Sequence, residues 1–174
     1  IFAEFLQQQL NEVQGEEIPK LHRRASNWYS AHDNQDAAIV HALAAGDNER
    51  AAELIGCHFN QLVQTGGVIT LAGWIRKLPL EVINARPRLC LAVAWGYLFS
   101  LDLDLADEWS EAARTQAEKQ IAEQEQAGGD LHAARELLGQ VAAYQALIAT
   151  IRGNSQLTLK YLHEALDLLP EDDL

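Results

Sequence analysis

The sequence predicts an all-α fold, a right-handed superhelix of antiparallel helical hairpins. Hydrophobic residues make up 48% of the 174 residues and aromatic residues only 7%. Alanine and leucine therefore supply most of the apolar mass, a balance that favours helices over strands. The 11 glycines and 4 prolines fall mostly between segments whose apolar residues recur at helical spacing. No segment alternates polar and apolar residues over a useful length.

The first half of the chain is expected to form helices joined by short turns. An amphipathic helix is expected over residues 1–13, and Gly15 ends it. The next helix is expected over 17–31, and Asp33 is predicted to cap a helix over 34–45. These are the first elements of the predicted stack.

A Gly-Asp pair marks the next turn. Gly46 suits the left-handed position that ends a helix, and Asp47 is predicted to cap a helix over 48–64. A short helix over 68–78 and one more helical turn over 79–83 follow. The inner stripe of the helix over 48–64 is predicted to hold Ala51, Leu54, Ile55, His58, Phe59 and Leu62.

The second half is predicted to form two longer hairpins. Pro87 suits the first turn of a helix that runs to about Ser100. Asp130 is predicted to cap a later helix, and Gly153-Asn154 turns the chain into the last one. The remaining helices are expected over residues 103–126, 131–152 and 155–169.

Small residues recur in these two hairpins. Such side chains let antiparallel helices approach closely and leave each pair an apolar face that only the next pair covers. The extra polar length around 117–130 is interpreted as an extended helix and loop. Ala94, Tyr97, Ala106 and Ala113 define the first unit, and Ala146, Ala149, Leu162 and Ala165 are placed on equivalent inner faces of the second. This spacing resembles the tetratricopeptide repeat.

Residues 21–55 and 71–99 resemble a more particular family, the MalT-like, ATP-dependent transcriptional activators of the LuxR class. The resemblance lies in His22-Arg23-Arg24-Ala25 with Trp28-Tyr29, Ala38-Ile39 with His41-Ala42-Leu43 and Ala45-Gly46-Asp47, Trp74 with Leu78-Pro79, and Arg86-Pro87-Arg88-Leu89. It implies that residues 1–14 end a winged-helix domain, that 15–85 form a helical arm, and that 86–174 begin a tetratricopeptide-like sensor.

The resemblance also implies a function. Such a segment is non-catalytic and cytoplasmic, and it couples a small-molecule inducer or regulatory protein to its own ATPase domain and to a DNA-binding domain. Self-association is implied as well. ATP and Mg²⁺ are implied for the full-length protein only, because no GxxxxGK[ST] loop occurs here. Since Ile1 lies in mid-helix pattern, we interpret the chain as a piece of a longer protein. The alternative is a free-standing tetratricopeptide adaptor that binds peptides or proteins.

Charge and motifs exclude several function classes. The net charge is −12 with no basic stripe, so direct contact with nucleic acid is not expected. No apolar run reaches membrane-spanning length.

Cys57 and Cys90 form no CxxC pair and no nucleophile–base pattern, so an enzyme is not expected. The histidines show no metal-ligand spacing, and no cofactor is expected in this segment. His22-Arg23-Arg24 either contacts a phosphate or partner, or pairs on the surface with Glu16 and Glu17.

A groove is the candidate binding site. In the repeat register, Trp95 lies on the face that lines the concave side of the superhelix. The alternative is that Trp95 is covered by the neighbouring hairpin. Trp28 and Trp74 are expected to hold neighbouring hairpins together. The candidate groove residues are Arg88, Trp95 and Phe99 in the first unit and Gln140 and Thr150 in the second.

Overall fold

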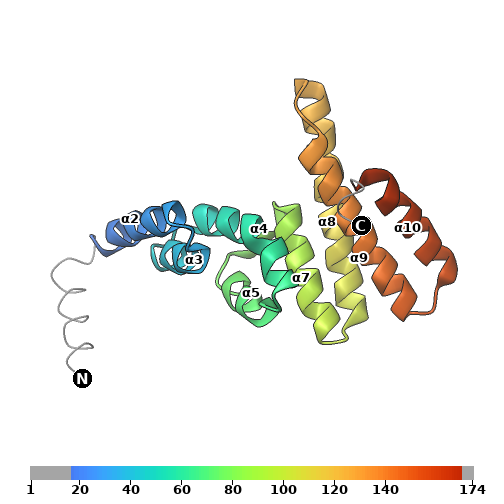
Figure 1. Cartoon of the computed structure of the whole chain (residues 1–174), viewed down its shortest axis with the longest axis horizontal. Helices are drawn as coiled ribbons and strands as arrows, with labels where there is room; N and C mark the ends of the chain where they lie inside the picture. The colour runs from blue at the N-terminus through green and yellow to red at the C-terminus, as the bar shows by residue number, and fades with distance from the viewer. Residues whose placement is uncertain (1–16, 170–174) are drawn as a thin grey trace.

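The computed structural model describes residues 17–169, and within that range all regular secondary structure is helical (Figure 1). The expected helix over 1–13 and the predicted winged-helix terminus over 1–14 lie outside the described residues. The helices are α2 (Ile18–Ala31), α3 (Gln35–Ala44), α4 (Asn48–Gln64), α5 (Val68–Ile75), α6 (Leu80–Asn84), α7 (Pro87–Phe99), α8 (Leu103–Ala127), α9 (His132–Ile151) and α10 (Ser155–Leu168).

Neighbouring helices pack as antiparallel pairs along an elongated stack. The closest pairs are α2 with α3, α7 with α8, and α9 with α10, and α8 also packs against α9. Figure 1 shows the α2–α3 pair at one end and α10 at the other. The prediction of an all-α solenoid of helical hairpins is confirmed.

Most turns follow the predicted chemistry. Gly46 adopts a φ of +67°, a left-handed conformation that glycine reaches without strain. The side chain of Asp47 then accepts a hydrogen bond from the backbone nitrogen of Arg50 at 3.2 Å. Gly153 has a φ of +72°, and Asn154 caps α10 through the backbone nitrogen of Leu157. The turn residues therefore end one helix and begin the next.

Two predicted caps are displaced by one residue. Asn34, not Asp33, caps α3, because its Oδ1 accepts from the nitrogen of Ala37 at 3.1 Å. Asp33 instead takes the left-handed conformation that reverses the chain, with a φ of +57°. Asp130 accepts from the nitrogen of His132 at 2.9 Å, but Leu131 occupies the cap position.

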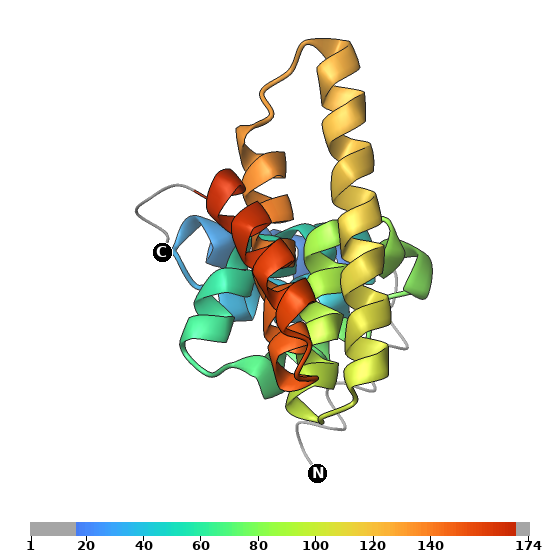
Figure 2. The same cartoon turned by 90° about the vertical axis from the view of Figure 1, so that its right-hand side faces the viewer.

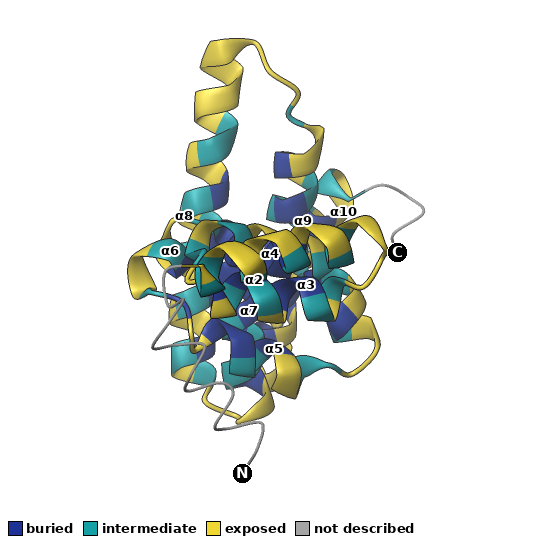
Figure 3. Cartoon of the chain, turned by 90° about the vertical axis from the view of Figure 1, so that its left-hand side faces the viewer, coloured by how far each residue is buried: buried dark blue, intermediate teal, exposed yellow. Residues whose placement is uncertain are grey.

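The small residues of the repeat lie where helices meet. Ala94, Ala106 and Ala113 are completely buried between α7 and its neighbours. Ala146, Ala149 and Ala165 are buried between α9 and α10. Figure 3 shows that buried residues follow the interior of the stack, while the far part of α8 is largely exposed. The interior therefore runs from one hairpin to the next, as expected of stacked repeats.

Two predicted inner residues are exposed. Leu162 is 43% exposed, because it lies on a face of α10 that no other described helix covers. Trp28 is 56% exposed and stacks on the ring of His32, with centroids 4.0 Å apart, so it does not hold hairpins together. Trp74, by contrast, is buried in the core.

A polar network fastens the last three helices to one another. Nε of Arg114 on α8 donates to Oε1 of Gln145 on α9 at 2.9 Å, and its Nη1 donates to Glu164 on α10 at 2.5 Å. Gln145 is itself buried, so its amide oxygen has little access to water. The guanidinium of Arg114 supplies the hydrogen bonds that this buried acceptor needs. Beyond the network, α8 extends past the stack as the predicted long helix and loop (Figure 2).

Gly139 of α9 lies directly against the end of α10. A Cβ atom there would lie 2.9 Å from Cγ of Leu169 and 3.0 Å from Cβ of Leu168. Both distances are shorter than ordinary contacts, and the Cβ of Leu168 cannot rotate away. The lack of a side chain at Gly139 therefore allows the end of α10 to lie against α9.

We expect Gly139→Ala and Gly96→Ala to have opposite effects on the free energy of unfolding. A Cβ at Gly96 on α7 meets nothing within 4 Å. Gly96→Ala should therefore gain up to about 1 kcal/mol from helix propensity. Gly139→Ala should lose about 1–3 kcal/mol to overpacking, which outweighs that gain. Urea unfolding measures both, and an equal gain in the two variants would contradict the packing described here.

Candidate functional site

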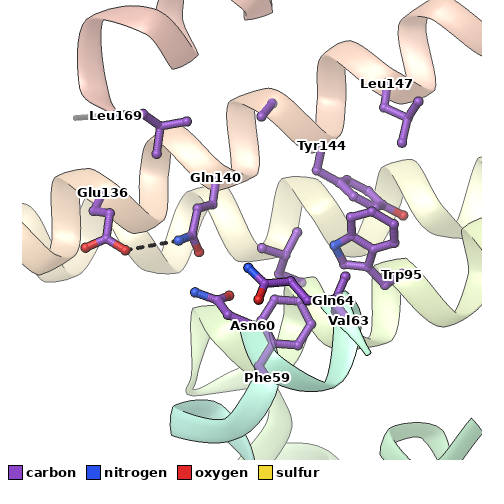
Figure 4. Close-up of a pocket in the computed structure, with 12 residues that line it drawn as sticks. Phe59, Asn60, Val63, Gln64, Trp95, Glu136, Gln140, Tyr144, Leu147 and Leu169 are labelled. Carbon is purple, nitrogen blue, oxygen red and sulfur yellow. Dashed lines mark hydrogen bonds between the residues drawn. The ribbon is translucent and has the colours of Figure 1, made fainter. Parts of the chain in front are cut away.

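A hollow of about 470 Å³ lies between α4, α7 and α9 (Figure 4). Its walls combine apolar and aromatic side chains with three carboxamides and one carboxylate. The lining residues are Phe59, Asn60, Val63 and Gln64 from α4, Leu91 and Trp95 from α7, Glu136, Gln140, Ala143, Tyr144 and Leu147 from α9, and Leu169 after α10.

Helical periodicity places these side chains. Leu91 and Trp95 are four residues apart on α7, and Glu136 and Gln140 are four apart on α9, so each pair shares one face of its helix. On α4, Phe59 belongs to the buried stripe, and Asn60 follows at the edge of that stripe. The three helices pack through their apolar faces. The side chains at the borders of those faces, some polar and some apolar, therefore meet around the hollow.

The aromatic wall is held by Tyr144. Its ring lies 5.2 Å from that of Trp95 between centroids, at an interplanar angle of 60°. Its hydroxyl donates to the backbone carbonyl of Ala94, which links α9 to α7. Burial raises the pKa of the Tyr144 hydroxyl above its usual range, and the negative charge of Asp107 adds to the shift. The hydroxyl therefore remains a donor at neutral pH and fixes the ring.

The polar wall is centred on Gln140. Its Nε2 donates to Oε1 of Glu136 at 3.1 Å. Its own Oε1 is buried and accepts no hydrogen bond from any residue of 17–169. Among residues 17–169, Glu136 is the one carboxylate in the lining, and no lysine, arginine or histidine of that range lines the hollow. The described part of the lining thus contains several acceptors and no positively charged side chain.

The structure brings two of the five predicted groove residues together here. Trp95 and Gln140 both line the hollow. Phe99 lies beside Trp95, with ring centroids 6.0 Å apart, but it is 64% exposed and does not line the hollow. Arg88 lines a separate depression with Cys57. The hydroxyl of Thr150 turns back to the carbonyl of Ala146 at 2.8 Å.

Sequence reasoning missed the contribution of α4. Phe59 was placed in the inner stripe, but Asn60, Val63 and Gln64 gave no signal of a site. They line the hollow because α4 packs beside α7. The repeat comparison covered only the two later hairpins, so it gave no information about α4. Tyr144 and Glu136 were also missed, although both share the face of α9 that carries Gln140.

The histidine and cysteine candidates have other surroundings. Nδ1 of His22 and Nδ1 of His41 are 2.8 Å apart, which joins α2 to α3. His58 contacts Asp36 at 3.1 Å. Cys90 is buried, and burial raises the pKa of its thiol to about 11, so the reactive thiolate is disfavoured. Among residues 17–169, no three His, Cys, Asp or Glu side chains converge as metal ligands would.

Arg23 pairs differently from the sequence-based expectation. Its Nε lies 3.4 Å from a carboxylate oxygen of Asp47, whereas Glu17 contacts Lys20. Both pairs lie at the surface, with Asp47 half-buried, and each contributes little on its own. In the described part of the chain, no helix is long and apolar enough to cross a bilayer.

Comparison with known proteins gives partial matches. No family model matches the chain, and no solved structure matches it. The chain is 38% identical over 96 residues to the serine/threonine-protein kinase PknK of Mycobacterium tuberculosis, a match to 55% of this chain and 9% of that protein. It is 34% identical over 95 residues to the HTH-type transcriptional regulator MalT of Cronobacter sakazakii, a match to 55% of this chain and 10% of that protein. The chain thus resembles a small part of each.

We expect Tyr144→Phe to weaken the loss of stability at alkaline pH. The raised pKa of Tyr144 means that ionisation is favoured in the unfolded chain, so wild-type stability is full below about pH 10 and falls above it. Between about pH 9 and about pH 11, the free energy of unfolding should fall by about 1 kcal/mol less in the variant. The Cys90 thiol, whose pKa is also raised, contributes equally to both proteins. If denaturation at both pH values shows the same fall in the free energy of unfolding for wild type and Tyr144→Phe, the expectation is contradicted.

Proposed function

We propose that this chain is a non-catalytic sensing and transmission segment of an ATP-dependent transcriptional regulator of the LuxR class. In this proposal, an inducer or a regulatory protein occupies the hollow between α4, α7 and α9. ATP and Mg²⁺ are bound, and DNA is contacted, by other parts of such a cytoplasmic regulator. The observation that carries the proposal is the partial match to MalT, and the hollow among the described helices supports it.

The two matched proteins support a role in receiving and passing on a signal, rather than in the activity that either protein's name states. One is named as a transcriptional regulator and the other as a protein kinase. Each shares only about a tenth of its length with this chain. Because their named activities differ, a shared segment is better suited to a function that both can use. Reception and transmission of a signal is such a function.

The position of the hollow suggests how transmission works. The predicted boundary between arm and sensor lies at residues 85 and 86. The hollow is lined by α4 on the arm side and by α7 and α9 on the sensor side. An occupant that contacts α4 and α9 together would stabilise one relative position of the two parts. A ligand shifts such an equilibrium only by its difference in affinity for the two positions, and packed helices move by small rotations or translations.

A substitution that fills the hollow tests this proposal in the intact gene. Ala143 lines the hollow on α9, so Ala143→Phe should exclude an occupant. In the native host, we expect the transcripts that depend on the gene to be lost in a deletion strain and in the Ala143→Phe strain. Glu123→Gln, on the exposed far part of α8, should behave as wild type.

Transcript sequencing, with protein abundance measured by immunoblot, reads out this test. Equal abundance of the variant proteins shows that folding is retained. If Ala143→Phe supports normal transcript levels, the hollow is not the sensing site. If deletion changes no transcript while the 174-residue chain binds a peptide, the free-standing adaptor is the better description.

A further inference from the structure

A second depression, of about 250 Å³, lies between α5 and α7, which pack side by side (Figure 1). It shares no lining residue with the hollow between α4, α7 and α9. Ala72 of α5 and Val93 and Tyr97 of α7 line it, and all three are partly exposed. Ile69 shares a face of α5 with Ala72 and is 87% exposed. Together these four residues form an accessible apolar surface, the α5–α7 groove.

Two helix glycines border the groove without a packing role among residues 17–169. Gly96 of α7 lines it, and Gly73 follows Ala72 on α5. A Cβ atom at either glycine would meet nothing within 4 Å, whereas a Cβ at Gly139 would meet Leu169 at 2.9 Å. Glycine is less favourable than alanine inside a helix. The groove therefore leaves room for another molecule to approach two helix backbones closely.

The dimensions of the groove favour a helix over a small molecule. Sites that enclose small molecules have volumes of about 300–1,000 Å³, and the depression between α5 and α7 is smaller than that. The space between two packed helices can instead receive a row of side chains from a third helix. Residues 17–169 themselves pack helix against helix. We therefore expect an occupant that is a helix lying over the groove.

The charge around the groove differs in sign from that of the whole chain, which has 25 acidic and 13 basic residues. The segment 54–101 includes α5 and α7 and contains one acidic residue, Glu81, and the basic residues Arg76, Lys77, Arg86 and Arg88. Arg76 lines the depression, and Lys77 follows it. Both are exposed, and neither forms a salt bridge with any residue of 17–169. These two accessible cations favour a partner that carries carboxylates.

We propose that the α5–α7 groove docks an acidic amphipathic helix of a partner protein. The apolar face of that helix packs on Ile69, Val93 and Tyr97, and its backbone passes close to Gly96. Its carboxylates pair with the cations at the end of α5. This inference goes beyond the proposed sensing function, because the groove uses a different face of α7 from the hollow.

Three synthetic peptides of about 15 residues, long enough to form a helix when bound, test the partner class by fluorescence anisotropy on the 174-residue chain. They share leucine and alanine at helical spacing and differ in carrying glutamate, glutamine or lysine at the polar positions. We expect the glutamate peptide to bind at least about tenfold more tightly than the glutamine peptide. Equal or tighter binding of the glutamine peptide would overturn the proposal, as would the failure of the glutamate peptide to bind at millimolar concentration.

Variants tie this binding to the groove. Gly96→Leu fills the groove without meeting a neighbouring residue at Cβ, so it should fold normally and weaken binding of the glutamate peptide at least about tenfold. Gln124→Leu adds the same side chain on the exposed far part of α8 and should bind as wild type. Arg76→Gln should weaken binding of the glutamate peptide about threefold and leave that of the glutamine peptide within about twofold. Circular dichroism confirms that each variant is folded.

The same variants distinguish other occupants. The lysine peptide can bind acidic surfaces elsewhere on the chain, so its affinity should be the same in wild type and Gly96→Leu. If Gly96→Leu abolishes lysine-peptide binding, or leaves glutamate-peptide binding unchanged, the proposal is wrong. Sedimentation velocity tests for a second copy of the chain in the groove. A concentration-dependent dimer that Gly96→Leu abolishes would identify the second copy as the occupant and overturn the proposal of a partner protein.

Discussion

Close approach of neighbouring helices through alanine and glycine is the constraint on which the rest of this molecule depends. Ala94, Ala106 and Ala113 have no exposed surface where α7 meets α8. Gly139 allows the end of α10 to lie against α9. Small contact residues bring helix backbones close together, and the larger side chains at the edges of each helix then meet between hairpins. The hollow between α4, α7 and α9 is formed by such edges, so its shape follows from the spacing of the stack.

The sequence was most informative where one residue has one structural role. Gly46 has to adopt a left-handed conformation, Asp47 caps the next helix, and Pro87 begins α7, and all three were predicted. Prediction was less accurate where two residues can fill one role. Asp33 and Asn34 both tolerate the turn and both can cap, and the backbone path from α2 decides that Asn34 is the cap.

The candidate site was only partly predictable, for a related reason. The repeat register compares α7 with α9, and it found Trp95 and Gln140 because those helices share the hollow. It gave no information about α4, whose place beside α7 is a tertiary contact between segments of different pattern. Arg88 shares α7 with Trp95 but lies beside Gly56 of α4 in a separate depression, and Phe99 lies at the exposed end of α7. The exposure of Leu162 likewise depends on what packs beyond α10, which helical periodicity does not reveal.

The close packing of small residues underlies the proposed function, because displacing the helices would alter the hollow that is proposed to sense a ligand. Its most direct test compares the melting temperature and helicity of Ala106→Trp with those of a variant at Glu123, an exposed residue on the same helix. We expect a large loss of both in Ala106→Trp, because an indole cannot fit between α7 and α8 without overpacking, and almost no change in the Glu123 variant. Equally small effects in both variants would contradict it.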